Sequence, residues 1–245
     1  MNEKNVKKIV KDSYSKIAKK ETCSCCSSAQ SDIDIANSIG YSDEEIASVG
    51  EANLGLGCGN PTALANISKG DVVLDLGSGA GFDSFLASRK VGNTGKIIGV
   101  DFTEEMIEKA RGLAKKYNYN NVEFKLGDIE NLPIKNESID IIISNCVINL
   151  ASDKLKVFKE AYRVLKKTGR MYVSDIVLLS DLTEEQRNNE ELIAGCVGGA
   201  LLKNDYLNII VDAGFNYRIL DENMDISKKQ YGGINLESLK VELYK

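Results

Sequence analysis

Short, continuous apolar runs alternate with helical patterns through the middle of the chain. The apolar runs predict strands at 72–76, 96–100, 122–125, 139–144 and 170–175. Between them, apolar residues spaced three or four positions apart predict helices at 82–89, 103–117 and 152–166. Because the runs are apolar throughout, we expect an α/β fold whose mostly parallel sheet carries helices on both faces.

The two ends of the chain follow other patterns. Residues 3–20 predict an amphipathic helix with Tyr14 near its apolar face, and residues 22–31 predict a mobile polar loop. Ser42 and Glu45 form the capping-box pattern of a short helix over 42–49. In the last third we expect helices through 191–202 and 204–213, then strands near 215–220 and 238–244 that pair as an antiparallel hairpin at the sheet edge.

The composition narrows the chemistry more than the fold. The 245 residues include no histidine, which excludes histidine bases, Ser-His and Cys-His nucleophiles and histidine-rich metal sites. The formal charge is −5, and no long run of Lys or Arg favours a nucleic-acid partner. The sequence contains no apolar stretch of about 18 residues, so it predicts no membrane span. The 1–20 segment is charged and lacks the apolar region of a secretory signal. We therefore expect a monomeric cytoplasmic protein, with no nucleic-acid or membrane partner, whose six cysteines are reduced.

A glycine-rich loop follows the first strand of the alternating region. The sequence from Val73 to Gly81 reads Val-Leu-Asp-Leu-Gly-Ser-Gly-Ala-Gly, and its glycines allow a tight turn and close approach by a ligand. It departs from the dinucleotide fingerprint because Phe82 stands where a small residue belongs. Asp75 suits a cationic ligand better than a pyrophosphate, and Asp101 ends the next strand, where an acid can hold a ribose diol.

From 71 to 244 this pattern resembles the class I S-adenosylmethionine-dependent methyltransferases. The resemblance implies a Rossmann-like, seven-stranded sheet whose last strand is antiparallel. It also implies that Asp128 and Ile129 flank the adenine, and that Asn145 lies near the methionine end of the cofactor. On this basis the expected cofactor-binding residues are Tyr14, Asp75, Gly77, Ser78, Gly79, Gly81, Asp101, Phe102, Asp128, Ile129 and Asn145.

The cysteines point to a particular kind of methyl transfer. A free cysteine is commonly a small buried apolar residue, and this is the simpler interpretation of each one alone. Together, however, Gly-Leu-Gly-Cys-Gly-Asn-Pro around Cys58, Ser-Asn-Cys-Val-Ile-Asn-Leu around Cys146 and Ala-Gly-Cys-Val-Gly-Gly-Ala around Cys196 resemble the motifs of arsenite methyltransferases. The N-terminal tyrosine-then-cysteine order and the stretch 173–178 agree with that family.

This second resemblance implies the chemistry of the site. Trivalent arsenic is thiophilic, so thiolates of Cys58, Cys146 and Cys196 would hold it with its lone pair facing the sulfonium methyl. The family pattern also implies a redox disulfide between Cys58 and an N-terminal cysteine, for which we favour Cys26 over Cys23 and Cys25. A thiol reductant of the glutathione or thioredoxin type would reopen it. Cys23 and Cys26 also have the spacing of a zinc or dithiol pair.

We expect the chain to divide into an N-terminal helix with a cysteine-containing lid segment (1–60) and a cofactor-binding methyltransferase domain (61–245). The second part would carry an arsenic-binding insertion around 180–214, and we expect no separate C-terminal domain. The predicted function is methylation of arsenite and thiol-bound arsenic(III) for arsenic detoxification. The alternatives are a C- or O-methyltransferase of a small molecule, such as a quinone precursor, and a thiol-based arsenical sensor that does not bind the cofactor.

Overall fold

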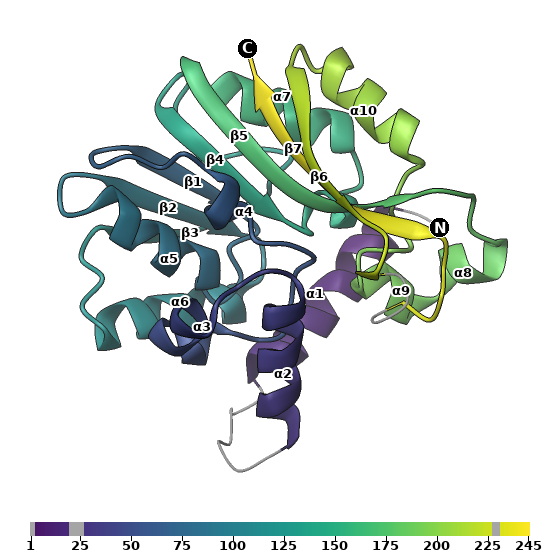
Figure 1. The fold of residues 1–245 in the computed structure, drawn as a ribbon, viewed down its shortest axis with the longest axis horizontal. Coiled ribbons are helices and arrows are strands. Elements are labelled where there is room, and N and C mark those ends of the chain that lie inside the picture. The colour runs from purple at the N-terminus through teal and green to yellow at the C-terminus, as the bar shows by residue number, and fades with distance from the viewer. Residues whose placement is uncertain (1–2, 20–26, 227–230) are drawn as a thin grey trace.

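The structure is a computed structural model that describes residues 3–19, 27–226 and 231–245 (Figure 1). A seven-stranded sheet in the order β3-β2-β1-β4-β5-β7-β6 forms its centre. The pairs from β3 through β5 are parallel, whereas β7 is antiparallel to both of its neighbours. The predicted sheet and its edge hairpin are therefore confirmed. The strands are β1 (Val72–Leu76), β2 (Lys96–Asp101), β3 (Val122–Leu126), β4 (Ile139–Asn145), β5 (Leu165–Leu178), β6 (Asn216–Asn223) and β7 (Leu236–Tyr244).

Helices pack on both faces of the sheet, as the continuous apolar strands predict. Val73 of β1 packs in one cluster with residues of α5 (Phe82–Val91) and α4 (Pro61–Leu64). Leu74 and Leu76 face the other way, in a cluster with residues of α7 (Lys154–Val164) and α10 (Lys203–Asp212). The alternation along β1 thus leaves Asp75 on the α5 side, at the end of a buried strand.

The N-terminal segment lies against the ends of the strands. Helix α1 (Glu3–Lys19) contacts α6 (Glu104–Lys116) on one side and α9 (Glu190–Ala194) on the other, and it crosses beneath the sheet between them (Figure 1). It is followed by α2 (Ser27–Ser38), α3 (Asp43–Ser48) and the 3-10 turn η1 (Gly50–Ala52), and Ser42 and Glu45 form the predicted capping box. None of the described helices is long and apolar enough to cross a membrane.

Three sequence predictions of local structure are wrong. Residues 27–31 belong to α2 rather than to the loop expected over 22–31. Helix α7 ends at Val164, and β5 begins five residues earlier than the strand predicted at 170–175. After Thr183 the chain forms the short helices α8 (Glu184–Asn188) and α9, and α9 stops at Ala194, so the helix predicted through 191–202 is wrong beyond that residue. Beyond it Cys196 adopts a left-handed φ of 67°, which a continuous right-handed helix does not allow. Gly199 packs so closely that a Cβ would lie 2.2 Å from the Asn149 carbonyl oxygen.

Candidate active site

A chain of cavities runs along the carboxyl ends of β1, β2 and β4. The first, of about 90 Å³, is lined by Asp75, Gly79 and Asp101. It shares Gly77 and Asp101 with a cavity of about 30 Å³ that reaches the segment after β3. It shares Cys146 with a third cavity, of about 440 Å³, which reaches the segment after α9. The three cavities therefore form one path along the edge where open α/β sheets bind ligands.

The glycine loop and Asp101 shape the middle of this path. Gly77, Gly79 and Gly81 all have positive φ, so the loop turns in a conformation that other residues adopt at a cost. Asp101 accepts hydrogen bonds from the backbone N–H groups of Gly79 at 3.0 Å and Thr103 at 2.8 Å. Phe102 lines the same cavities. The second acid of the predicted signature is thus fixed against the loop that the first strand supplies.

Two buried acids, Asp75 and Asp83, lie together in the lining of the first cavity. Burial and the nearby Asp83 raise the pKa of Asp75 well above its usual range, and burial raises the pKa of Asp83 to about 6. Tyr41 Oη donates a hydrogen bond of 2.7 Å to Asp83, and Asn145 Nδ2 donates one of 3.2 Å. Two carboxyl groups held this way form a site for a cation, because a bound positive charge favours their ionised forms.

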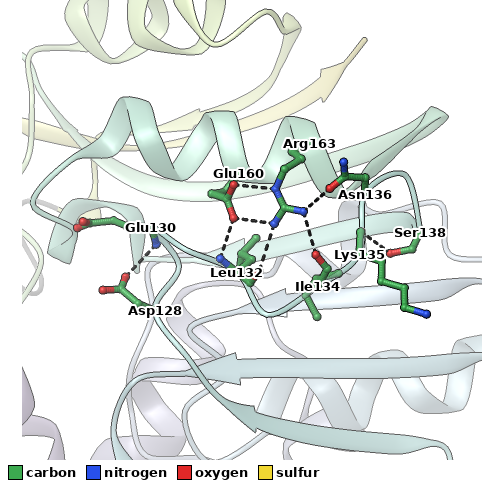
Figure 2. A network of polar contacts seen from close by, with 9 residues as sticks. All are labelled: Asp128, Glu130, Leu132, Ile134, Lys135, Asn136, Ser138, Glu160 and Arg163. Atoms are coloured by element: carbon green, nitrogen blue, oxygen red, sulfur yellow. Dashed lines mark hydrogen bonds and ion pairs between the residues drawn. The ribbon is translucent and has the colours of Figure 1, made fainter.

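Asp128 and Ile129, on the loop after β3, line the smallest of the three cavities. Arg163 of α7 holds the rest of this loop, with hydrogen bonds of 3.1 Å to the Leu132 carbonyl oxygen and 2.9 Å to that of Ile134 (Figure 2). Glu160 bridges the same elements: it pairs with Arg163 at 2.7 Å and accepts the Leu132 N–H at 2.8 Å. The network on α7 therefore fixes the loop at Leu132 and Ile134, whereas Asp128 itself accepts the Glu130 N–H at 2.9 Å (Figure 2).

Helix α1 contributes side chains to all three cavities of the path. Lys7 Nζ lies 2.8 Å from Asp128 Oδ2 and 3.0 Å from Glu130 Oε2. Tyr14, two helical turns further on, lines both the first and the third cavity, and its hydroxyl donates to the Ala194 carbonyl oxygen at 3.4 Å. The structure thus places Tyr14 between the cofactor loop and the cysteine segments.

Cys146 and Cys196 line the third cavity, and Cys58 lies behind them; all three thiols are buried and free. The Ser174 carbonyl oxygen accepts the Cys58 thiol at 3.3 Å and the Cys146 N–H at 2.8 Å. Cys196 Sγ donates to the Cys146 carbonyl oxygen at 2.6 Å. Burial raises the pKa of the Cys146 thiol well above its usual range, and the contacts with Cys196 and Cys58 add to the rise. Cysteines that are far apart in the sequence therefore meet in one group, with Cys146 in the middle.

The backbone around these thiols is strained or closely packed. Cys146 and Cys196 have positive φ values of 56° and 67°, which residues with a Cβ rarely adopt. Gly57 and Gly59 flank Cys58, and a Cβ on either would meet Asn145 or Ser174 at 2.8 Å or less. Strain that the surrounding structure maintains is typical of functional sites.

Comparison with known proteins identifies relatives of this chain. A methyltransferase domain family matches residues 67–214. The arsenite methyltransferase of Halobacterium salinarum is 46% identical over 192 residues, which are 78% of this chain and 49% of that protein. The solved structure of an arsenic(III) S-adenosylmethionine methyltransferase from Chlamydomonas reinhardtii is 32% identical, covers 86% of this chain and 73% of its own, and superposes with a TM-score of 0.69.

The chain belongs to the arsenite methyltransferase family. The human arsenite methyltransferase is also similar, with 43% identity over 152 residues, or 58% of this chain and 40% of that protein. The chain spans about half the length of the curated relatives it matches.

The residues along the path fit S-adenosylmethionine. Ser78 Oγ and Thr103 Oγ1 line the first cavity, are buried and have no hydrogen-bond partner within the described part of the chain. The paired acids suit the ammonium group of the methionine, and Asp101 has the place of an acid that accepts ribose hydroxyls. Ile129 and Leu150 give the smallest cavity an apolar lining suited to a base.

Several residues of the site stand outside the motifs that the sequence shows. Tyr41, Asp83 and Lys7 carried no signal that we used, although Asp83 lies only two positions beyond the glycine loop. Asp175 was noted only as the end of a strand, yet a charged residue in an apolar strand is itself a signal. Tyr231 lines the third cavity beside Cys196. Cys23, Cys25 and Cys26, the candidates for the redox partner, lie outside the described residues.

Proposed function

We propose that this chain transfers the methyl group of S-adenosylmethionine to trivalent arsenic held by Cys58, Cys146 and Cys196. The observation that carries the proposal is that two cavities adjoin: Cys146 lines both the cavity of the cofactor loop and the cavity that reaches Cys196. A substrate bound to the thiols would therefore face the methionine end of the cofactor, beside Asn145. The proposed role is arsenic detoxification in a reducing compartment such as the cytoplasm.

Buried neutral thiols suit a neutral arsenic substrate. Burial raises the pKa values of Cys58 and Cys146, so both thiols hold their protons near neutral pH. Each exchange breaks an S–H and an As–O bond and forms an As–S bond and a water molecule. The thiol proton leaves on the hydroxide, and the buried site gains no net charge. Three exchanges leave arsenic with its lone pair and three sulfur ligands.

The protein contributes position rather than acid–base catalysis. S-adenosylmethionine supplies the electrophilic methyl group. The strained backbone at Cys146 and the hydrogen bonds at Ser174 fix the sulfurs, so the arsenic lone pair can align with the carbon–sulfur bond that breaks. The acids Asp75 and Asp83 hold the ammonium end of the donor.

The transfer raises arsenic formally from +3 to +5, and two electrons return it to the trivalent state. In the proposed cycle, the Cys26 thiol attacks the arsenic-bound sulfur of Cys58 and forms a disulfide. The As–S bond to Cys58 breaks and leaves its electron pair on arsenic, one proton leaves Cys26, and an external dithiol or two glutathiones reopen the disulfide. One chain provides all three described thiols, which supports a monomer as the working unit. Residues 1–60 act as the lid and 180–214 as the arsenic-binding insertion in this scheme.

Arsenic speciation tests the proposal. The wild type, incubated with arsenite, S-adenosylmethionine and a thiol reductant, should yield methylated arsenic that chromatography with elemental detection resolves. The Cys146→Ser/Cys196→Ser variant should yield almost none while it still binds the cofactor, as calorimetry would show. If neither protein methylates arsenic but both methylate a quinone precursor, the C- or O-methyltransferase alternative is correct.

A further inference from the structure

Asp175 is a buried carboxylate that the proposed methyl transfer does not use. It lies in β5, and its side chain is fully buried. Tyr206 donates a hydrogen bond of 2.6 Å to Oδ2, whereas Oδ1 has no hydrogen-bond partner among the described residues. The buried amine of Lys154 does not satisfy it, because its Nζ donates to the carbonyl oxygens of Asn149 and Ala151. A buried polar atom without a partner is costly, so its presence needs an explanation.

The neighbours of Asp175 suggest a ligand. A carboxylate oxygen of Asp175 and the Sγ atoms of Cys58 and Cys146 lie within 4.8 Å of one another. Around a tetrahedral zinc ion, two sulfurs or a sulfur and an oxygen lie about 3.5–3.8 Å apart, given Zn–S and Zn–O bonds of about 2.3 and 2.1 Å. Small side-chain rotations would bring the three ligand atoms from their present separation, within 4.8 Å, to that spacing. The Tyr206 hydrogen bond orients the carboxylate in the way that partners of a metal ligand usually do.

We propose that Cys58, Cys146 and Asp175 form a binding site for a divalent cation of the zinc type. The set offers two thiolates and one carboxylate, a mixture of donors that zinc accepts, with a fourth position left for water or a further ligand. Binding releases the two thiol protons to solvent. Thiophilic arsenic(III) would instead bind the Cys196 thiol as its third ligand, in place of the Asp175 carboxylate. The two ions thus share two sulfurs and differ in the third ligand, so each excludes the other.

This inference stands apart from the proposed methylation, because it concerns binding in the absence of arsenic and of the cofactor. It is best tested in a full-length background in which Cys23, Cys25 and Cys26 are replaced by serine, so that only the three described thiols remain. Zinc affinity would be measured by competition with a chromophoric chelator, and arsenite affinity by calorimetry, both with a phosphine as reductant.

Two variants should separate the two ions. Asp175→Asn should weaken zinc binding about tenfold or more and leave arsenite binding within about twofold of the parent. Cys196→Ser should weaken arsenite binding and leave zinc affinity unchanged. Asp212→Asn, an exposed carboxylate of α10, is the matched control and should change neither. Zinc should also inhibit arsenite binding competitively in the parent.

The proposal is overturned if the parent protein binds no zinc, if Asp175→Asn binds it as the parent does, or if Cys196→Ser weakens zinc as strongly as Asp175→Asn. Should Asp175→Asn fail to fold, cadmium-113 NMR of the parent protein decides. A chemical shift typical of two sulfur ligands with oxygen supports the site, and one typical of three sulfur ligands overturns it. Failure of the methylation assay would leave these results unaffected.

Discussion

Asn145 Oδ1 accepts a hydrogen bond of 3.0 Å from the backbone N–H of Cys58. The amide group of the same side chain donates to the Gly59 carbonyl oxygen at 2.8 Å and to Tyr41 Oη at 3.0 Å. Asn145 ends β4 and lines the cofactor cavity. One side chain therefore lines the cofactor cavity and also holds the segment that carries Cys58.

Replacing Asn145 with alanine should weaken both ligands together. The change removes hydrogen bonds at buried positions, and we expect the affinities for S-adenosylmethionine and for arsenite each to fall about tenfold. Calorimetric titrations with each ligand alone would measure both. Asn188→Ala, at an exposed residue of α8, is the matched control. A loss confined to one ligand would contradict the proposed link.

The acids Asp75 and Asp83 predict a pH dependence of cofactor binding. Burial raises the pKa of Asp83 to about 6, and the pKa of its neighbour Asp75 is raised as well. Because only the ionised carboxylates attract an ammonium group, affinity for S-adenosylmethionine should be steady above about pH 7 and fall as the pH drops through 6. Asp83→Asn should bind more weakly at pH 7.5 and lose most of this dependence. An affinity that rises on acidification would contradict the assignment.

The raised pKa of Asp83 affects the stability of the protein without ligand in the opposite direction: stability falls as the pH rises. A carboxyl whose folded pKa exceeds its unfolded value binds more protons when folded, so the free energy of unfolding falls as pH rises between about 4 and 6. The effect is about 1–3 kcal/mol for a shift of this size. Asp83→Asn should therefore melt at a higher temperature than the wild type at pH 7.5, with the gap closing towards pH 4. Thermal unfolding followed by circular dichroism would show it.

Arg163 should support cofactor binding from a distance. Its guanidinium donates to the Leu132 and Ile134 carbonyl oxygens of the loop after β3 and pairs with Glu160. Arg163→Met would leave those carbonyls without donors, and we expect cofactor affinity to fall about threefold to tenfold and stability by about 1–3 kcal/mol. Arg218→Met, in edge strand β6, is the control for loss of an arginine. Unchanged cofactor affinity in Arg163→Met would show that the network does not support the cofactor cavity.

Gly199 tests the segment of Cys196 separately. A Cβ at this position would lie 2.2 Å from the Asn149 carbonyl oxygen, and backbone must move to admit it. Gly199→Ala should therefore lower arsenite affinity about tenfold or more while cofactor affinity changes little. At Gly112 in α6 a Cβ would meet nothing within 4 Å, so Gly112→Ala should bind both ligands as the wild type does. Equal loss of both ligands in Gly199→Ala would point to general misfolding instead.

Local patterns predict the sheet and the cofactor loop well because both depend on short stretches of sequence. Continuous apolar runs predicted the parallel strands. Asp75 and the glycines that follow β1 predicted the edge of the sheet at which a ligand binds. The structure brings Cys58, Cys146 and Cys196 together as the motifs suggested, but spacing alone could not have shown it. Asp83 and Asp175 were missed because their importance comes from burial beside groups distant in sequence. The helix predicted through 191–202 failed because α9 stops at Ala194 and Cys196 takes a left-handed φ, which the apolar spacing of the sequence does not reveal.

A single-turnover assay tests the central claim most directly. Protein loaded with arsenite would be mixed with S-adenosylmethionine labelled in its methyl group, with no external thiol, and the label located by chromatography and mass spectrometry. We predict about one labelled methyl on arsenic per chain in the wild type and almost none in Cys196→Ser, which should still bind the cofactor. Label that stays on the cofactor in both proteins, or appears equally on arsenic in both, would contradict methyl transfer to a thiol-held arsenic at this site.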